Sequence, residues 1–355
     1  MSTVIRNRDR GVLFESEKGT VKEALEEAAS RGIRLHSASI GEKNLDGICL
    51  RGGKFRKATF RTDSMIRADL SGDFQGASLC HMKLQGSSFV GADFRKASLA
   101  GSCLCGSDLR RINLAYGSLD QAFLSGADFR EANLTGVVLT GTEIVGADFS
   151  GAVMKETEYR GGAMVDCLFI GTNLDGATMC PRCSQLTIRF TRANFSGASL
   201  KGADLTRAHF EDVNFSSTNL RKVDMPGAYI SFNDIRGANF EEANLEGTTF
   251  SFPLDRTITF EGVNFRGANL KGVNFEKIDL ANADFRGANL EGANFFEAKK
   301  DGANFEGANM TRTVFSENWE PECWGGEEES EEEMMVKYGI DPVPRKIIEP
   351  CLRFC

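Results

Sequence analysis

The sequence predicts a repeat protein of the solenoid kind, in which the chain turns every few residues around a narrow interior. From Leu35 to Phe315 a large apolar residue stands at every fifth position, and a small residue, most often Ala, precedes it by two places. The other three positions of each unit are mostly polar. A period of five fits neither a helix nor a strand, so regular helices and flat strands are excluded over this range.

The apolar positions follow three registers. They run from Leu35 to Leu70, move back by one residue from Phe74 to Met179, and return to the first register from Phe190 to Phe315. Two of these inward positions hold charged residues, Asp255 and Lys300. Because an unpaired charge inside a narrow apolar core is costly, we expect both units to bulge outward.

The stretch Ala283–Phe295 carries the clearest copies of the repeat, ADFRG, ANLEG and ANF. It resembles the consensus of the pentapeptide repeat family, Ala-(Asp/Asn)-(Leu/Phe) followed by two variable residues. The resemblance covers about four fifths of the chain. It implies an all-β solenoid, a right-handed quadrilateral β-helix with one five-residue unit on each side.

Four units per coil give about 14 coils, and a spacing of ~4.8 Å between coils gives a rod roughly 65 Å long. Residues one coil apart are then expected to stack on each other. This predicts two internal ladders of phenylalanine rings, through Phe129, Phe149 and Phe169 and through Phe265, Phe285 and Phe305.

Residues 20–31 have the pattern of an amphipathic helix ahead of the repeat. Thr20 and Glu23 form a capping box at its start, and Gly32 stands where a C-terminal cap is expected. Because the open first coil of a β-helix is a row of unpaired backbone groups, we expect this helix to cover it. A separate partner-binding helix is the alternative. The apolar run Val12–Phe14 suggests an additional edge strand.

The chain therefore divides into an N-terminal cap (residues 1–34), a β-helix (35–315) and an acidic C-terminal tail (316–355). The tail holds Trp319 and Trp324, and Glu327–Glu333 contains six Glu in seven residues. In several pentapeptide repeat proteins a C-terminal helix joins two rods. The resemblance thus implies a capping or dimerisation segment and a homodimer through the C-terminal end, while a solvated acidic run is the simpler interpretation.

Composition excludes several classes of protein. No apolar run approaches the ~20 residues that span a bilayer, and Met1–Arg10 carries three Arg and no apolar core of a secretion signal. The ten cysteines in a chain of this kind suggest a reducing compartment rather than a disulfide framework. We expect a cytoplasmic protein that does not associate with membranes.

Charge bears on one function of the family, in which rods that resemble duplex DNA bind DNA gyrase or topoisomerase in its place. Of 50 acidic and 42 basic residues, 11 and 4 lie in residues 316–355, so residues 1–315 hold 39 and 38 and a net charge of −1. Duplex DNA carries one negative charge per ~1.7 Å. The rod is therefore a poor DNA mimic by charge, although mimicry by shape stays open.

The sequence gives little sign of chemistry. Cys180 and Cys183 have ligand-like spacing, but a zinc site usually needs four ligands and no second pair or nearby His accompanies them. The chain has three His and neither a phosphate-binding Gly loop nor a nucleophile motif. We predict no enzymatic activity, no cofactor and no metal.

Recognition is expected where the regular faces are broken or charged. One basic cluster lies on the first coils, with Asp63 as the single acid among its residues, and it is either a charge-rich rim or a patch for an acidic partner. The register breaks and the tail supply the other candidates. The candidate partner-binding residues are Arg51, Lys54, Arg56, Lys57, Arg61, Cys180, Arg182, Cys183, Asp255, Arg256, Lys299, Lys300, Trp319 and Trp324.

Together these observations predict a non-enzymatic protein that binds a macromolecular partner, which we expect to be another protein, and no direct binding to nucleic acid. The alternative is a DNA-mimic modulator of gyrase or topoisomerase. A short helix that leads directly into pentapeptide units also resembles family members carried by phages and prophages. That resemblance implies an antagonist of a host factor.

Overall fold

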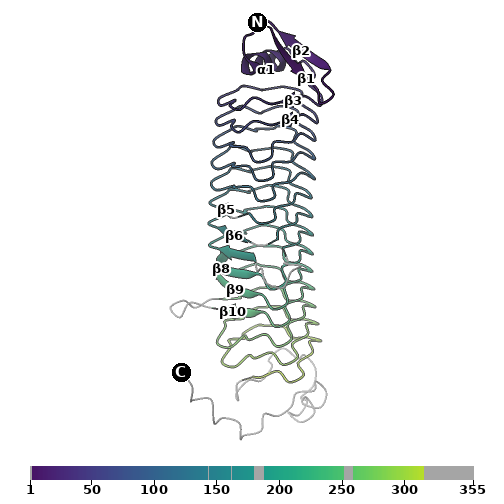
Figure 1. The fold of residues 1–355 in the computed structure, drawn as a ribbon. Coiled ribbons are helices and arrows are strands. Elements are labelled where there is room, and N and C mark those ends of the chain that lie inside the picture. The colour runs from purple at the N-terminus through teal and green to yellow at the C-terminus, as the bar shows by residue number, and fades with distance from the viewer. Residues whose placement is uncertain (1, 143, 161, 180–187, 252–258, 316–355) are drawn as a thin grey trace, which may run out of the picture.

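The computed structural model describes residues 2–142, 144–160, 162–179, 188–251 and 259–315, and it confirms the predicted β-solenoid. Figure 1 shows the chain as a rod of stacked short coils with a small cap at its N-terminal end. The helix α1 (Val21–Ser30) spans 10 residues. The described part of the chain holds no helix that is long and apolar enough to cross a lipid bilayer.

Parallel pairing between residues one coil apart holds the coils together. Asp93 pairs with Asn113, and Asn113 pairs with Asn133. Each coil is thus four five-residue sides long, as the repeat predicts. The Asp or Asn before an apolar centre also stabilises the following turn, since Asp148 accepts a hydrogen bond from the Ser150 N–H at 2.8 Å.

The corners explain why glycine recurs in the repeat. At each tight turn the second residue has a positive φ, for example 68° at Gly151. Glycine adopts this conformation without strain. Other residues also occupy it, such as Glu156 with a φ of 55°, and an L side chain pays about 1–2 kcal/mol there.

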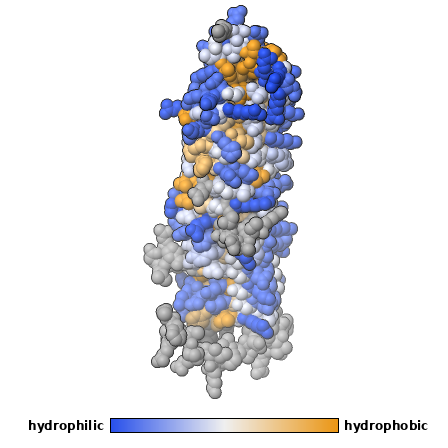
Figure 2. All heavy atoms as spheres, in the orientation of Figure 1, coloured by the Kyte–Doolittle hydropathy of each residue, from blue (hydrophilic) through white to orange (hydrophobic). Residues whose placement is uncertain are grey.

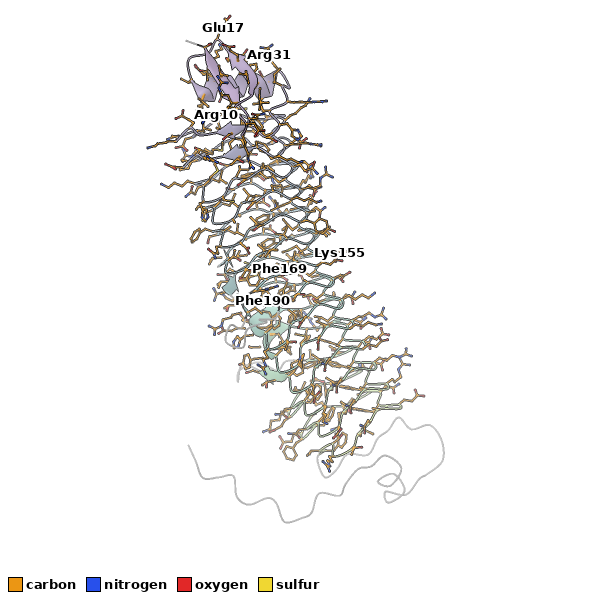
Figure 3. The ribbon with its side chains drawn as sticks, turned by 45° about the vertical axis from the view of Figure 1, so that its right-hand side comes forward. Arg10, Glu17, Arg31, Lys155, Phe169 and Phe190 are labelled. Atoms are coloured by element: carbon orange, nitrogen blue, oxygen red, sulfur yellow. The ribbon has the colours of Figure 1, made fainter. Side chains whose placement is uncertain are left out.

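The interior is a continuous apolar column. The rings of Phe129 and Phe149 stack with centroids 5.0 Å apart, and those of Phe149 and Phe169 with centroids 5.1 Å apart, which confirms the first predicted ladder. The ladder through Phe265, Phe285 and Phe305 is confirmed as well, at 5.2 and 5.0 Å. Figure 3 shows the side chains along the rod, with Phe169 and Phe190 labelled beside Lys155, which is exposed.

The helix of the cap forms as the sequence predicts. Thr20 is the N-cap and accepts a hydrogen bond from the Glu23 N–H, although its hydroxyl, rather than its N–H, donates to the Glu23 carboxylate. At the other end Gly32 has a φ of 63°, and Ile33 donates to the Ala28 carbonyl in a Schellman motif. The helix therefore ends where glycine permits the reversal.

The expected edge strand is one arm of a hairpin. Strands β1 (Thr3–Arg6) and β2 (Val12–Ser16) pair antiparallel, with Ile5 and Phe14 buried. Asn7 pairs with Ala38 of the first coil, next to β3 (Ser39–Ile40), which pairs with β4 (Thr59–Phe60). Hairpin and helix together close the first coil, as Figure 1 shows at the N-terminal end.

At the first change of register, two glycines of neighbouring coils are in contact. Gly72 lies where the step from one apolar centre, Leu70, to the next, Phe74, is four positions instead of five. A Cβ on Gly72 would lie 2.7 Å from the carbonyl oxygen of Gly53, so the two backbones touch. The short unit fits because neither residue has a side chain at this contact.

On one side of the rod, turns give way to extended strands. These strands form a six-stranded parallel sheet in the order β10-β9-β8-β7-β6-β5. They are β5 (Ile144–Val145), β6 (Gly162–Val165), β7 (Ile188–Thr191), β8 (His209–Asn214), β9 (Tyr229–Asp234) and β10 (Thr249–Ser251). In the coils that supply this sheet, one of the four sides is therefore an extended strand rather than a turn.

Extra residues do not disturb the core. Asn173 pairs with Ser199, and Asn239 pairs with Asn264, across longer intervals than elsewhere in the rod. Even so, the rings of Phe169 and Phe195 stack at 4.7 Å between centroids. The inward ladder of rings therefore continues across both longer intervals.

Candidate interaction surface

The six-stranded sheet marks one side of the rod, which we call the sheet side. It carries β5–β10 and, in the coils before them, Lys83, Cys103 and Phe123, which pair in that order. The other three sides repeat Asp, Asn or Ser before most apolar centres. On the sheet side the type of the outward residue differs from coil to coil, so this side presents a surface whose composition differs from that of the other three.

The first half of the sheet side is apolar. Phe123 has an exposed fraction of 61% and Val145, in the next coil, has 47%. The Gly126 N–H donates to the Val145 carbonyl, which fixes these two coils side by side. Val145 is in turn the register partner of Val165.

The patch continues around the corner of the rod through Leu168 and Ile170, which are also exposed. In Figure 2 apolar side chains gather near the middle of the rod on the face that carries β5 and β6, with hydrophilic side chains beside them. We define the apolar patch as Phe123, Val145, Val165, Leu168 and Ile170. Contiguous apolar surface of this kind is typical of binding sites.

The second half of the sheet side carries a stack of planar groups. The His209 imidazole and the Tyr229 phenol lie 4.5 Å apart between centroids and 13° from parallel. Arg189 precedes His209 in the same column. Burial, together with the nearby Arg189 charge, lowers the pKa of His209, so the imidazole is neutral at pH 7.

Two thiols lie beside the apolar patch. The Sγ atoms of Cys103 and Cys105 are 3.4 Å apart, and Cys105 also faces the Phe123 carbonyl oxygen at 3.7 Å. Burial, and then the neighbouring Cys103, raise the pKa of the Cys105 thiol, so it is a weak nucleophile. Within the described ranges, no three His, Cys, Asp or Glu side chains converge as metal ligands.

The structure distributes the predicted basic cluster over several sides. Arg51 pairs with Asp69 at 2.8 Å, and Arg56 pairs with Asp73 at 2.7 Å. Lys54, Arg56 and Lys57 share one side, whereas Arg51 precedes that side and Arg61 follows the next. Only part of the cluster therefore forms a common surface.

Lys299 and Lys300 lie at the last described coils. The Lys299 Nζ is 3.9 Å from the Asp279 carboxylate. The expected outward bulge at Lys300 is wrong: its Nζ donates to the Ala298 carbonyl at 2.9 Å and lies 5.8 Å from the centre of the Phe315 ring. Burial lowers the pKa of Lys300, and its backbone keeps the regular turn.

The remaining predicted site residues lie outside the described residues. They are Cys180, Arg182, Cys183, Asp255, Arg256, Trp319 and Trp324. In the sequence, residues 180–187 directly precede β7, which begins at Ile188, and residues 252–258 directly follow β10, which ends at Ser251.

Carboxylates on the regular sides are neutralised locally. Arg130 binds Asp128 at 2.6 Å and lies 3.7 Å from Asp148, and Arg110 binds Asp108 at 2.7 Å and lies 3.7 Å from Asp128. The hydrogen bonds from Arg130 lower the pKa of Asp128. This column alternates in sign, unlike the uniformly negative surface of a DNA duplex.

The comparisons with known proteins agree with this architecture. The family model described as pentapeptide repeats matches in eight copies within residues 73–155, 188–251 and 260–317, which is more than half of the chain. The chain belongs to the pentapeptide repeat family. No curated protein matches it significantly.

Solved structures of the same class are similar to it. HetL, a pentapeptide repeat protein involved in heterocyst differentiation regulation from the cyanobacterium Nostoc sp. strain PCC 7120, is 25% identical, with 69% of this chain and 92% of HetL covered and a TM-score of 0.25. QnrB1, a plasmid-mediated fluoroquinolone resistance protein, is 16% identical, with coverages of 69% and 90% and a TM-score of 0.24. The family assignment rests on the repeat match.

Sequence reasoning missed the apolar patch. The signal was present in the repeat itself, because Phe123 and Leu168 stand where Asp, Asn or Ser usually precedes the apolar centre. An apolar residue at an outward position is a departure as informative as a break in register. Searching for breaks alone directed attention to residues 180–187 and 252–258 instead.

Proposed function

We propose that the protein is a non-enzymatic binding protein that holds a protein partner on the sheet side. The observation that supports this most is the apolar patch, where Phe123 and Val145 point outward from an otherwise polar repeat. A few well-packed anchor residues near the centre of a protein interface, aromatic ones prominent among them, supply most of its binding energy. The neighbouring His209–Tyr229 stack adds planar groups with polar edges, which suit specific contacts.

A rigid rod suits this role because its outward residues lie on a backbone fixed by pairing on both sides. Binding then costs little ordering of the surface. The register breaks that hold Cys180, Arg182, Cys183, Asp255 and Arg256 flank the sheet side in sequence, so we include them as the rim of the same surface.

The test is affinity capture from the cells in which the protein occurs. We expect the double variant Phe123→Ser/Val145→Thr to lose the captured partner while keeping the wild-type melting temperature. Tyr116→Ser is the matched control, because Tyr116 is also 61% exposed but lies outside the sheet side. Equal capture by wild type, control and double variant would contradict the proposal.

DNA mimicry is the weaker functional hypothesis. The alternating Arg and Asp column and the net charge of −1 for residues 1–315 oppose binding to a saddle that selects a polyanion. We expect no inhibition of gyrase supercoiling at stoichiometric protein. Inhibition that duplex DNA relieves by competition would favour mimicry instead.

We also propose association through the C-terminal end, which would use Trp319, Trp324 and the apolar part of the tail. Deleting residues 316–355 is then expected to convert a dimer into a monomer, as the mass from light scattering shows directly. The same oligomeric state for full-length and truncated protein would show that the tail is not the interface. A cytoplasmic location and a phage-type antagonist of a host factor are narrower parts of the same proposal, and the captured partner tests them.

A further inference from the structure

The side of the rod opposite the sheet side carries a cationic surface near the cap. Its ladder runs from Arg34 through Lys54 and Asp73 to Asp93. The paired residues Arg34 and Lys54 are both cations, and both are exposed. We define the basic side as these coils with their outward residues Arg34, Lys54, Arg56, Lys57, Arg95 and Lys96.

Internal pairing leaves most of this charge available. Arg56 binds Asp73 at 2.7 Å, and Arg95 binds Asp93 at 2.6 Å. Arg34, Lys54, Lys57 and Lys96 form no ion pair with any residue in the described ranges. The basic side therefore keeps a net positive charge of about four on a rod whose first 315 residues are nearly neutral.

The spacing of these cations indicates the shape of the ligand. Arg34 and Lys54 lie in successive coils, and Lys96 lies two coils beyond Lys54, so the cations extend along the rod over roughly 14 Å at ~4.8 Å per coil. They do not converge on one point as a site for a single small anion does. An extended chain of negative charges fits this column.

We propose that the basic side binds an acidic polypeptide segment. Nucleic acid fits less well, because Asp73 and Asp93 interrupt the cations and would face phosphates, and among the described residues the one exposed Phe, Tyr or Trp ring close by, that of Tyr116, lies one coil beyond Lys96. A polypeptide segment, unlike a nucleic acid, can place uncharged residues opposite these two carboxylates and its Glu or Asp side chains opposite the free Lys and Arg groups. This surface is independent of the sheet side and extends the cluster seen in the sequence to Arg34, Arg95 and Lys96.

A direct binding measurement tests this proposal with the full-length protein. The probe is a fluorescent 12-residue peptide rich in Glu, and its control has Gln in place of each Glu. We expect anisotropy to show binding of the Glu peptide alone, weakening as salt rises. A single-stranded RNA of the same number of charges is expected to bind more weakly at equal salt.

Variants locate the interaction on the rod. Because exposed ion pairs are individually weak, we expect the loss of two of them in Lys54→Gln/Lys57→Gln to weaken binding only about tenfold. Lys201→Gln is the matched control, an exposed Lys on the same side in a distant coil, and should bind as wild type. Equal affinity of the double variant and wild type, equal binding of the Gln peptide, or tighter binding of the RNA would each overturn the proposal. None of these outcomes involves the sheet side.

Discussion

The column through Asp108, Asp128 and Asp148 and the column through Cys103 and Phe123 lie on neighbouring sides of the same coils, yet they differ in kind. In the first column each carboxylate meets an Arg, and the pattern repeats from coil to coil. In the second column the outward group changes from a half-buried thiol at Cys103 to an exposed aromatic ring at Phe123. Backbone pairing is the same in both, so the outward residues are free to vary without cost to the fold.

This difference separates stability from recognition. Inward residues and corners determine whether the rod forms, and outward residues on a paired backbone determine what it binds. The effect of a substitution on stability should therefore depend on whether the side chain points inward or outward. An inward change is expected to cost several kcal/mol of unfolding free energy, and an outward change on the sheet side should cost almost none.

The largest effect is expected at Phe149, which is fully buried between Phe129 and Phe169. Phe149→Ala should lower the free energy of unfolding by about 3–5 kcal/mol through the cavity it leaves. Phe149→Asp should prevent folding, because a carboxylate between two rings has no partner. Circular dichroism during denaturation measures both, and Phe123→Ala serves as the outward control. A folded Phe149→Asp protein with wild-type melting would refute the stacked ladder.

A smaller effect is expected at the change of register. Gly72→Ala places a Cβ 2.7 Å from the Gly53 carbonyl oxygen, so the backbone must shift, at a cost of about 1–3 kcal/mol. Gly41→Ala is the control, because nothing lies within 4 Å of its Cβ position. Equal melting temperatures for the two variants would show that the coils are not in contact at Gly72.

Corner residues should give effects near 1 kcal/mol and of opposite sign. Gly292 has a φ of 67° with open space around it, so Gly292→Ala is expected to destabilise the rod by conformational strain alone. Glu156→Gly relieves the same strain at a corner with a φ of 55° and should stabilise it by about 0.5–1 kcal/mol. Chemical denaturation compares the pair, and two changes of the same sign would contradict this account of the corners.

The smallest effect concerns pH on the sheet side. Because burial and Arg189 lower the pKa of His209, the folded protein binds fewer protons than the unfolded chain below the ordinary histidine pKa of ~6.5. The titration of His209 therefore costs no unfolding free energy above pH ~6.5. Below that pH the unfolding free energy declines as the pH falls toward the folded-state pKa of His209. His209→Gln should reduce the loss of melting temperature between pH 7.5 and 5.5 relative to the wild type. An equal loss in the variant and the wild type would show that His209 does not cause the pH dependence.

Most of the fold could be predicted from the sequence because a strict period constrains every inward residue. The ring ladder through Phe149 and the cap between Thr20 and Gly32 follow from local pattern and side-chain volume. The sheet side could not be predicted in the same way. Whether a corner is a tight turn or an extended strand depends on how coils of unequal length fit together, which a single unit of the repeat does not specify.

The predicted site residues were chosen by charge and irregularity, and this choice was only partly informative. It identified Lys54 and Lys57 on the basic side, but it could not show that Arg51 and Arg56 pair with acids from the following coil. Those acids, Asp69 and Asp73, are 18 and 17 residues away in sequence. Such neutralisation depends on the stacking of coils and is visible only once the register is known.

Site-specific photocrosslinking tests most directly the claim that the sheet side is the recognition surface. A photoreactive amino acid is placed at Val165 on the sheet side or at Asn173, two units later on a regular side, and crosslinks are formed in the native cells. The account predicts that one protein partner is crosslinked from position 165 and not from position 173. Crosslinks to the same partner from position 173 alone, or with equal yield from both positions, would contradict it.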